Sequence, residues 1–321
     1  MSGKPVFNPS ENLMKKHEGR NYSTQAVLDE LDKRYEQTEQ SSDQPFSKKN
    51  LIYFTLNHDL EYLQLFLYCI KSIAYKDIKD KFDFLIICPP AFEQIIKEVI
   101  YDKKIDLNNF ELYFFHVPEA NDGIEASMNK LKIYQWKYIH YYGKVLYLDA
   151  DILARKPVSE LFNLNLDRNI FYSAIHTQGR DVKLHNNKFH RITSYGPERM
   201  QYFKDLNLTV FNAGQFLFVN SKRMLHHFYN VDWLARAWPE EFFFEQSFLN
   251  HYFNYFYISD THTLYDKVKF VAVHWDERGD FEAQQKPDFS LIHFTGHACD
   301  ANKKLEYMRR HTPELIPNLY V

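Results

Sequence analysis

The chain of 321 residues is poor in cysteine and glycine, and it contains no long apolar run. Its cysteines, Cys69, Cys88 and Cys299, lie far apart, so they form neither a metal-ligand spacing nor an even-numbered disulfide framework. This usage favours a reducing compartment. No stretch approaches the roughly 18 apolar residues of a membrane span, and Met1 to Ser10 lacks the apolar core of a signal peptide. We therefore expect a soluble, cytoplasmic protein.

Two phosphate-binding motifs are also missing, as is any large excess of basic charge. The sequence has neither a GxGxxG nor a GKS/GKT loop, so a bound nucleotide must be held by other means. The formal net charge is −3, which gives no global attraction to nucleic acid or to an anionic membrane. We expect no nucleic-acid partner. The hydrophobic content of 45% instead predicts a globular body with a substantial core.

Residues 1–46 differ in composition from the rest of the chain. They are polar and include a run from Glu36 to Pro45 that has too little apolar surface to fold by itself. We expect a flexible arm, in which Ala26 to Tyr35 forms a short amphipathic helix. Residues 47–321 are predicted to form a single domain. The sequence leaves a homodimer open.

Strand and helix patterns alternate after this arm. Strands are predicted at Leu51–Leu56, Phe82–Cys88, Phe110–Val117 and Lys144–Leu148, separated by helices from the Asn57–Asp59 cap to Tyr75, at Ala91–Tyr101 and at Ser127–Tyr142. This order predicts an α/β fold with a mostly parallel, doubly wound sheet. Further strands are predicted at Asn169–Ile175, Phe211–Asn220, Val268–His274 and Ser290–Phe294, and helices at Lys222–Trp238 and Glu241–Phe253. Thr177 to Phe203 is interpreted as a polar loop over the site.

Two aspartates, Asp149 and Asp151, follow directly on the strand Lys144–Leu148. Side chains two residues apart in extended backbone point to the same face, so these carboxylates can approach one divalent cation. Taken alone, the pattern fits a solvated turn equally well. Its position is more informative, because open α/β sheets bind ligands outside the carboxyl ends of their strands.

Six short blocks then occur in a fixed order along the chain. They are Thr55-Leu56-Asn57 with Tyr62, Lys132 before Trp136, Tyr147-Leu148-Asp149-Ala150-Asp151, Phe211-Asn212-Ala213-Gly214, Glu245-Gln246, and Leu291-Ile292-His293-Phe294-Thr295-Gly296. In this order the blocks resemble glycosyltransferase family eight, over roughly Leu51 to Gly296. Such an ordered set is far harder to produce by chance than one Asp-x-Asp pair.

The resemblance implies a GT-A fold with an irregular C-terminal acceptor part. It also implies transfer of a hexose, glucose or galactose, from a UDP-sugar to a hydroxyl of a glycan, glycolipid or protein acceptor, with retention at the anomeric carbon. By the same resemblance Asp149, Asp151 and His293 bind Mn2+, with Mg2+ as the alternative ion. The chemistry is coherent, because two carboxylates neutralise a hard cation and one imidazole shifts the preference towards Mn2+.

The other blocks receive roles in the same way. The resemblance implies donor binding by Thr55, Asn57, Tyr62, Lys132, Ala150, Gly214 and Gly296, and catalytic roles for Asn212, Glu245 and Gln246. Lys130 is a weaker candidate than Lys132 for the donor phosphates. Glu245 stands where most relatives have aspartate, which lengthens the acid by one methylene.

The clearest departure from the family follows Gly296. Relatives usually continue with a lysine and a Pro-Trp pair, whereas this chain continues with His297-Ala298-Cys299-Asp300-Ala301-Asn302-Lys303-Lys304. Lys303, Lys304 or His297 is therefore left to supply the missing phosphate contact.

Three alternatives stay open at this stage. The first is glycogenin-like self-glucosylation on a tyrosine, which the many tyrosines allow. The second is a phosphatase of the haloacid-dehalogenase type with Asp149 as nucleophile, although Leu153 replaces the expected Thr or Val and His293 has no role in it. The third is a catalytically silent module that binds carbohydrate or nucleotide.

Overall fold

The computed structural model describes residues 24–57, 59–77, 82–107, 110–175, 201, 204–205, 207–237, 244–273, 288–296 and 301–312. The strands are β1 (Asn50–Thr55), β2 (Phe82–Cys88), β3 (Leu112–His116), β4 (Lys144–Leu148), β5 (Ile152–Ala154), β6 (Phe171–Ile175), β7 (Phe211–Val219), β8 (Ser259–Asp260), β9 (Val268–Ala272) and β10 (Leu291–Thr295). The α-helices are α2 (Thr24–Glu39), α3 (Leu60–Lys76), α4 (Pro90–Asp102), α5 (Gly123–Met128), α7 (Lys222–Ala237), α8 (Phe244–Tyr255) and α10 (Ala301–His311), and the 3-10 helices are η1 (Asn129–Gln135), η2 (Ile139–Tyr141) and η3 (Val158–Asn163).

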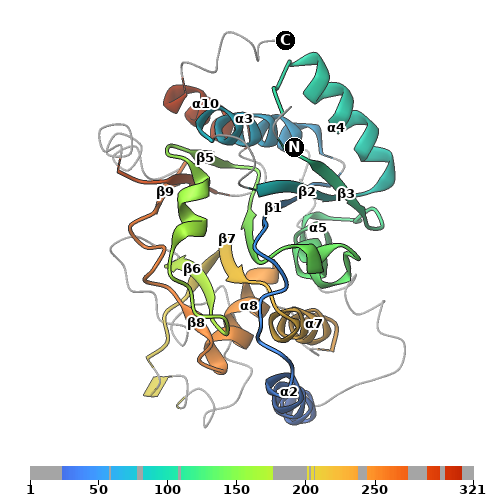
Figure 1. Cartoon of the computed structure of the whole chain (residues 1–321), viewed down its shortest axis with the longest axis vertical. Helices are drawn as coiled ribbons and strands as arrows, with labels where there is room; N and C mark the ends of the chain where they lie inside the picture. The colour runs from blue at the N-terminus through green and yellow to red at the C-terminus, as the bar shows by residue number, and fades with distance from the viewer. Residues whose placement is uncertain are drawn as a thin grey trace, which may run out of the picture.

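A seven-stranded sheet in the order β3-β2-β1-β4-β7-β6-β8 forms the centre of the molecule (Figure 1). The strands β3, β2, β1 and β4 run parallel, β7 is antiparallel to both β4 and β6, and β8 is parallel to β6. The crossovers through α3 and α4 connect neighbouring parallel strands, as βαβ units require. The mostly parallel, doubly wound sheet predicted from the sequence is confirmed.

Side chains alternate between the two faces along each strand, and an apolar cluster covers each face of this sheet. In β1, Ile52 and Phe54 pack in the cluster that contains the buried residues of α3, α4 and α10. Leu51 and Tyr53 point the other way, into the cluster formed with α2, α7 and α8. Because apolar side chains occupy both faces of the sheet, the polar residues of the site are left to collect at the ends of its strands.

A second, three-stranded sheet in the order β5-β10-β9 lies beside the first. The chain crosses between the sheets through Asp149, Ala150 and Asp151. The Asp149 amide donates to Gly214 O of β7 at 2.7 Å, while Asp151 O accepts from Phe294 N of β10 at 3.0 Å. The expectation that the aspartates share one face of an extended strand is wrong. Ala150 and Asp151 form a turn, and hydrogen bonds to both sheets hold it.

Several other elements differ from the sequence prediction. The helix expected over 127–142 is divided into α5, η1 and η2, with Trp136 in extended backbone between the 3-10 helices. The three-residue strand β5, the two-residue strand β8 and the helix α10 were not predicted. The loop expected over 177–203 lies outside the described residues except for Gln201.

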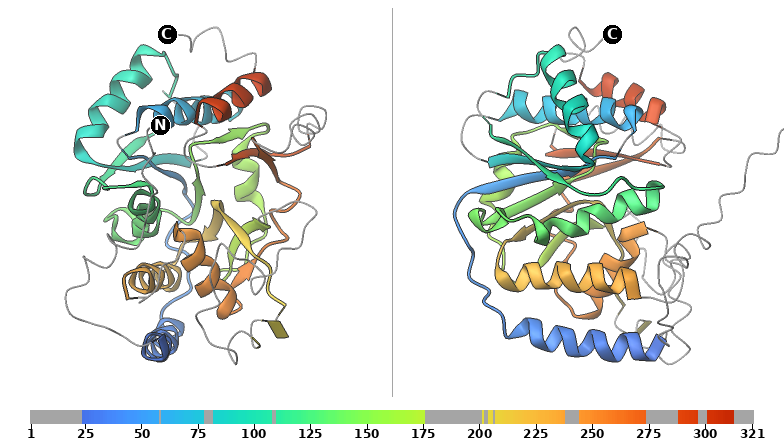
Figure 2. Two further views of the ribbon diagram at one scale, coloured as in Figure 1. Left: turned by 180° about the vertical axis from the view of Figure 1, so that it is seen from behind. Right: turned by 90° about the vertical axis from the view of Figure 1, so that its right-hand side faces the viewer.

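The N-terminal segment also differs from the expected flexible arm. From Thr24 onward it forms the helix α2, which packs against α7 and is the outermost layer on that side of the sheet (Figure 2). Val27, Leu28 and Leu31 are fully or almost fully buried, so the amphipathic stripe seen in the sequence has a partner. Whether residues 47–321 behave as one domain stays a prediction.

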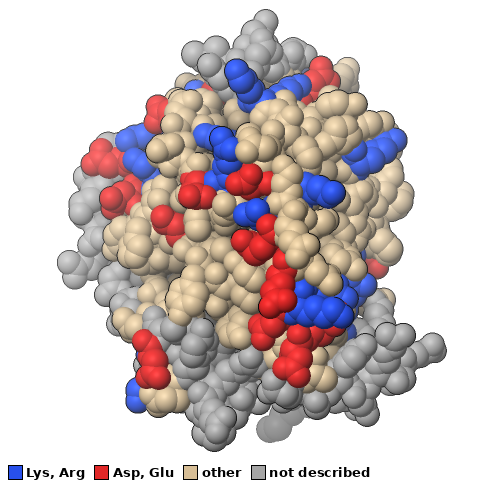
Figure 3. Space-filling view, turned by 60° about the horizontal axis from the view of Figure 1, so that its bottom comes forward, with Lys and Arg blue, Asp and Glu red and all other residues tan. Residues whose placement is uncertain are grey.

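Charged side chains of both signs are interspersed over the face seen in Figure 3, and the described basic residues form no continuous patch there. None of the helices that the structure describes is long and apolar enough to cross a membrane. The expected lack of a nucleic-acid partner stays a prediction.

Candidate active site

Asp149, Asp151 and His293 converge where the two sheets meet. Each offers one possible ligand atom, and these atoms lie within 4.8 Å of one another. His293 Nε2 is 3.2 Å from Asp151 Oδ1 and 4.0 Å from Asp149 Oδ2. Asp149 keeps 32% of its side chain exposed, whereas Asp151 keeps 7%, so Asp149 is the carboxylate that faces outward.

The contacts of His293 fit a cation at this position. Gln215 Oε1 lies 3.1 Å from His293 Nδ1, and an amide oxygen accepts a hydrogen bond, so Nδ1 is the donor and Nε2 is directed at the aspartates. Nε2 faces Asp151 Oδ1, a buried oxygen without a hydrogen-bond partner among the described residues. An imidazole nitrogen and a carboxylate oxygen are both common metal ligands. The set of oxygen, oxygen and nitrogen atoms therefore suits a divalent metal.

Gly214 makes room for this cluster. A Cβ atom at position 214 would lie 2.2 Å from His293 Cε1 and 2.6 Å from Asp149 Oδ2. Both distances are shorter than real Cβ contacts, so any side chain there would displace two of the candidate ligands. The absence of a side chain at Gly214 is thus a requirement of the site and not merely of a turn.

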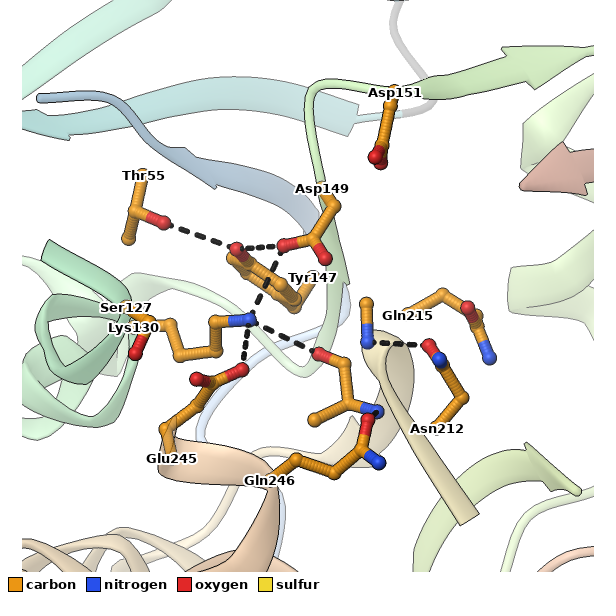
Figure 4. A network of polar contacts seen from close by, with 12 residues as sticks. Thr55, Ser127, Lys130, Tyr147, Asp149, Asp151, Asn212, Gln215, Glu245 and Gln246 are labelled. Carbon is orange, nitrogen blue, oxygen red and sulfur yellow. Dashed lines mark hydrogen bonds and ion pairs between the residues drawn. The ribbon is translucent and has the colours of Figure 1, made fainter. Parts of the chain in front are cut away.

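A buried lysine, Lys130 of η1, pairs with two acids (Figure 4). Its Nζ donates to Asp149 Oδ1 at 3.1 Å, to Glu245 Oε1 at 2.6 Å and to Ala213 O at 3.3 Å. Burial alone would lower its pKa, but the charges of Asp149 and Glu245 outweigh burial and raise the pKa above its usual value. Lys130 is therefore a permanent cation, and Glu245 is a buried ion-pair partner rather than a surface acid.

Tyr147 adds a second donor to Asp149. Its hydroxyl lies 2.5 Å from Asp149 Oδ1 and 3.0 Å from Thr55 Oγ1. Burial and the neighbouring charge of Asp149 raise the pKa of Tyr147 well above its ordinary value, so the hydroxyl keeps its proton. Thr55 is thereby connected to the candidate metal ligand through one side chain.

A second lysine, Lys304 of α10, pairs with the other aspartate. Its Nζ lies 2.8 Å from Asp151 Oδ2 and 3.4 Å from Gly296 O. Burial opposes ionisation of Asp151, but the charge of Lys304 holds the pKa of this carboxyl below its usual value. The two aspartates are thus each matched with a lysine, and the lysines come from helices on opposite faces of the sheet (Figure 2).

Three other predicted donor-binding residues make contacts outside the carboxylate–histidine cluster. Tyr62 lies beside Lys304, with Nζ 5.7 Å from the ring centroid, and burial raises its pKa to about 12. Asn57 exchanges hydrogen bonds with the backbone of Ala120. Lys132 donates to Asn129 Oδ1 at 2.8 Å, so Lys130, the weaker candidate from the sequence, makes the contacts with Asp149.

Two further predicted residues bind the backbone around Gly214, and a third lies in the turn between the aspartates. Asn212 Oδ1 accepts from Gly214 N at 2.7 Å, and Gln246 Oε1 accepts from Ala213 N at 3.0 Å. Ala150 is buried in the turn between the aspartates. Asn212 and Gln246 are therefore tied to the strand that presents Gly214.

Sequence reasoning missed one residue and underrated two. Gln215, which orients His293, directly follows the Phe211–Gly214 block, and its position was the available signal. Lys130 was ranked below Lys132 because Lys132 matches the family block, and the helix expected over 127–142 does not show which lysine reaches Asp149. Lys304 was only one of three candidates, since α10 was not predicted. His297, the third of them, lies outside the described residues.

Comparison with known proteins shows that the fold is that of the GT-A glycosyltransferases. The sequence model of glycosyl transferase family 8 matches residues 51–298, and the chain therefore belongs to this family. No curated protein sequence gives a significant match.

Solved structures resemble the chain at low sequence identity. The bifunctional glycosyltransferase WbbM is 17% identical with a TM-score of 0.55, over 85% of this chain and 51% of WbbM. An active-site mutant of LgtC is 16% identical with a TM-score of 0.50, over 80% of this chain and 94% of LgtC. Mouse xyloside xylosyltransferase 1 is 12% identical with a TM-score of 0.50, over 79% and 99% of the two chains. The chain thus spans about half of WbbM.

Proposed function

We propose that this glycosyltransferase moves a hexose, glucose or galactose, from a UDP-sugar to a hydroxyl of a glycan, glycolipid or protein acceptor, with Mn2+ as cofactor and with retention. The observation that carries the proposal is the convergence of Asp149, Asp151 and His293, in which Asp151 Oδ1 and His293 Nε2 face one another at 3.2 Å. Family membership supports glycosyl transfer over the phosphatase alternative.

In this proposal Asp149, Asp151 and His293 hold the cation, and the imidazole favours Mn2+ over Mg2+. When bound, the cation stabilises the negative charge that develops on the departing UDP. Gln215 keeps His293 Nε2 directed at the carboxylates, while Tyr147 and Lys130 fix Asp149 from its other side. Tyr62, Thr55 and Asn57 border the expected nucleotide corner after β1.

Retention requires either a nucleophile on the face opposite the leaving group or attack by the acceptor from the same face. Glu245 is the nearest matched carboxylate for the first route. Its Oε1, however, is bound to the permanent cation Lys130 at 2.6 Å, which lowers its nucleophilicity. The contact supports same-face attack, in which a phosphate oxygen of the donor accepts the acceptor's proton.

Ligand-dependent thermal unfolding tests the donor and the metal together. A panel of UDP-sugars is added to the protein with and without Mn2+, because a matched donor stabilises only the folded state. We expect stabilisation by one UDP-hexose that depends on Mn2+, and UDP release once an acceptor is present. Stabilisation by no UDP-sugar under either condition contradicts the proposal.

Product analysis then tests stereochemistry and acceptor type. With an α-linked donor, NMR coupling at the new anomeric centre is expected to show an α-linked product, and a β-linked product contradicts retention. Intact-protein mass spectrometry after incubation with donor alone shows whether the chain modifies itself. A stable glycosyl adduct on Glu245 would contradict same-face attack, whereas an adduct on tyrosine would indicate self-glucosylation.

A further inference from the structure

The second lysine of the site lies on a helix beyond the matched range 51–298. Lys304 is 2% exposed, so its ammonium cannot extend into solvent as a surface lysine does. Its Nζ lies 2.8 Å from Asp151 Oδ2. Its Nζ also lies 3.4 Å from Gly296 O, so this ammonium faces two oxygen acceptors.

The fold holds Lys304 in this position through several contacts of α10. The helix packs on α3 with Leu305, Tyr307 and Met308 buried. At its other end, His311 O accepts from Arg155 Nη1 at 3.2 Å. The position of the ammonium is therefore a built feature of the helix and does not depend on the mobility of one side chain.

The two oxygens of Asp151 face different partners. Oδ2 accepts from Lys304, whereas Oδ1 faces His293 Nε2 and has no hydrogen-bond partner among the described residues. A divalent cation bound at Oδ1 is thus close to the positive charge on the neighbouring oxygen. Like charges in a buried site repel strongly, so Lys304 opposes binding of the cation by itself.

When a diphosphate is bound as well, Lys304 favours cation binding instead of opposing it. The negative oxygens of the diphosphate attract the ammonium and the divalent cation together, and charge-assisted hydrogen bonds to phosphate are among the stronger polar contacts. Tyr62, which is proposed to border the nucleotide, lies beside the ammonium, with Nζ 5.7 Å from its ring centroid. Lys304 therefore favours the state in which cation and diphosphate are both bound.

We propose that Lys304 makes cation binding conditional on the nucleotide: it lowers the affinity of the site for Mn2+ alone and raises the affinity for UDP in the presence of Mn2+. This inference rests on the proposed function. Because linkage is reciprocal, the factor by which UDP increases Mn2+ affinity equals the factor by which Mn2+ increases UDP affinity.

Isothermal titration calorimetry with Mn2+ alone, and with UDP at saturating Mn2+, tests the proposal on the full chain. Lys304→Met removes the charge and keeps the length of the side chain, and Lys304→Gln keeps a donor for Asp151 if the first variant folds poorly. Arg310→Met is the matched control, since it removes the same charge from an exposed position of the same helix. Thermal unfolding confirms that each variant is folded.

We expect both Lys304 variants to bind Mn2+ alone more tightly than the wild type and to bind UDP with Mn2+ more weakly. The coupling between the two ligands is expected to fall by about 5- to 100-fold. Arg310→Met is expected to match the wild type. Unchanged coupling in a folded Lys304 variant overturns the inference. Failure of the wild type itself to bind UDP with Mn2+ would instead overturn the proposed function.

Discussion

The sheet junction and the α2–α7 layer both join segments that are far apart in the sequence, but they bury different groups. At the junction, Asp149 and Asp151 are each paired with a lysine, and no described residue donates to Asp151 Oδ1. In the layer, α2 buries Val27, Leu28 and Leu31 against α7.

This difference separates the residues that serve the reaction from those that stabilise the fold. Clustered charge costs desolvation energy and contributes little net stability, so its presence at the junction indicates a ligand that it serves. Apolar burial in the layer contributes stability directly. Variants at the junction should therefore change turnover more than folding, and variants in the layer should do the reverse.

Asp151→Asn is expected to have the largest effect on activity, with little effect on folding. Loss of one carboxylate ligand is expected to reduce Mn2+-dependent UDP release by more than about 100-fold. The protein should still fold, because the amide keeps an acceptor for Lys304 and opens no cavity. Initial rates over a Mn2+ titration provide the measurement, with the exposed Asp102→Asn as control. Full activity of the purified variant at low Mn2+ would show that Asp151 is not a ligand. The same loss is expected for His293→Ala.

Gly214→Ala is expected to lower both the activity and the stability of the protein. The new methyl group must displace His293 or Asp149, so we expect a loss of activity of about 100-fold and a destabilisation of about 1–3 kcal/mol. Gly123→Ala is the matched control, because its Cβ would meet no atom within 4 Å. Enzyme assays and denaturant unfolding on both variants give the comparison. Equal behaviour of the two variants would mean that the junction can relax around a methyl group.

The junction was largely predictable from the sequence, in residue identity if not in geometry. The strand Lys144–Leu148 was predicted with its observed bounds, and the resemblance named Asp149, Asp151 and His293. The sequence left an extended strand and a solvated turn open for the aspartates, because the backbone there depends on hydrogen bonds to Gly214 and Phe294, which lie far away in the sequence. Local pattern carries no information on such pairings.

The α2–α7 layer was less predictable for a related reason. The run from Glu36 to Pro45 is polar, and its composition favours disorder when read alone. Its backbone nevertheless has distant partners: Arg223 donates to Glu39 O and Ser41 O, and Pro45 pairs with Ser221. Composition measures what a segment can bury by itself, whereas this segment is held by a helix nearly two hundred residues later.

Leu31→Ala tests the α2–α7 layer and is expected to lower stability without changing turnover. Leu31 is fully buried, so truncation is expected to cost about 2–4 kcal/mol in the free energy of unfolding. Turnover well below the unfolding temperature should stay at the wild-type level, because residues 1–46 lie outside the matched range 51–298. Lys33→Ala, exposed on the same helix, is the control. A parallel loss of turnover in the folded variant would show that the layer supports the site.

The smallest expected effect is the pH dependence that the layer confers on stability. His227 is buried beside α2, with Nδ1 3.0 Å from the Tyr252 hydroxyl and Nε2 3.9 Å from Glu39. Burial, with a smaller effect of the Arg223 charge, lowers its pKa from 6.5 to about 3. Below pH 6.5 the unfolded chain therefore binds a proton that the native state does not bind.

Native stability from His227 is thus fully present above pH 6.5 and is lost as the pH falls towards 3. Between pH 7 and pH 5 this single group should cost about 2 kcal/mol. Urea unfolding at both pH values, on the wild type and on His227→Gln, isolates the contribution, because the other titrating groups are common to both proteins. We expect the wild type to lose about 2 kcal/mol more than the variant over this interval. Equal losses would mean that Glu39 approaches and stabilises the imidazolium, and that the layer buries a charge pair as the junction does.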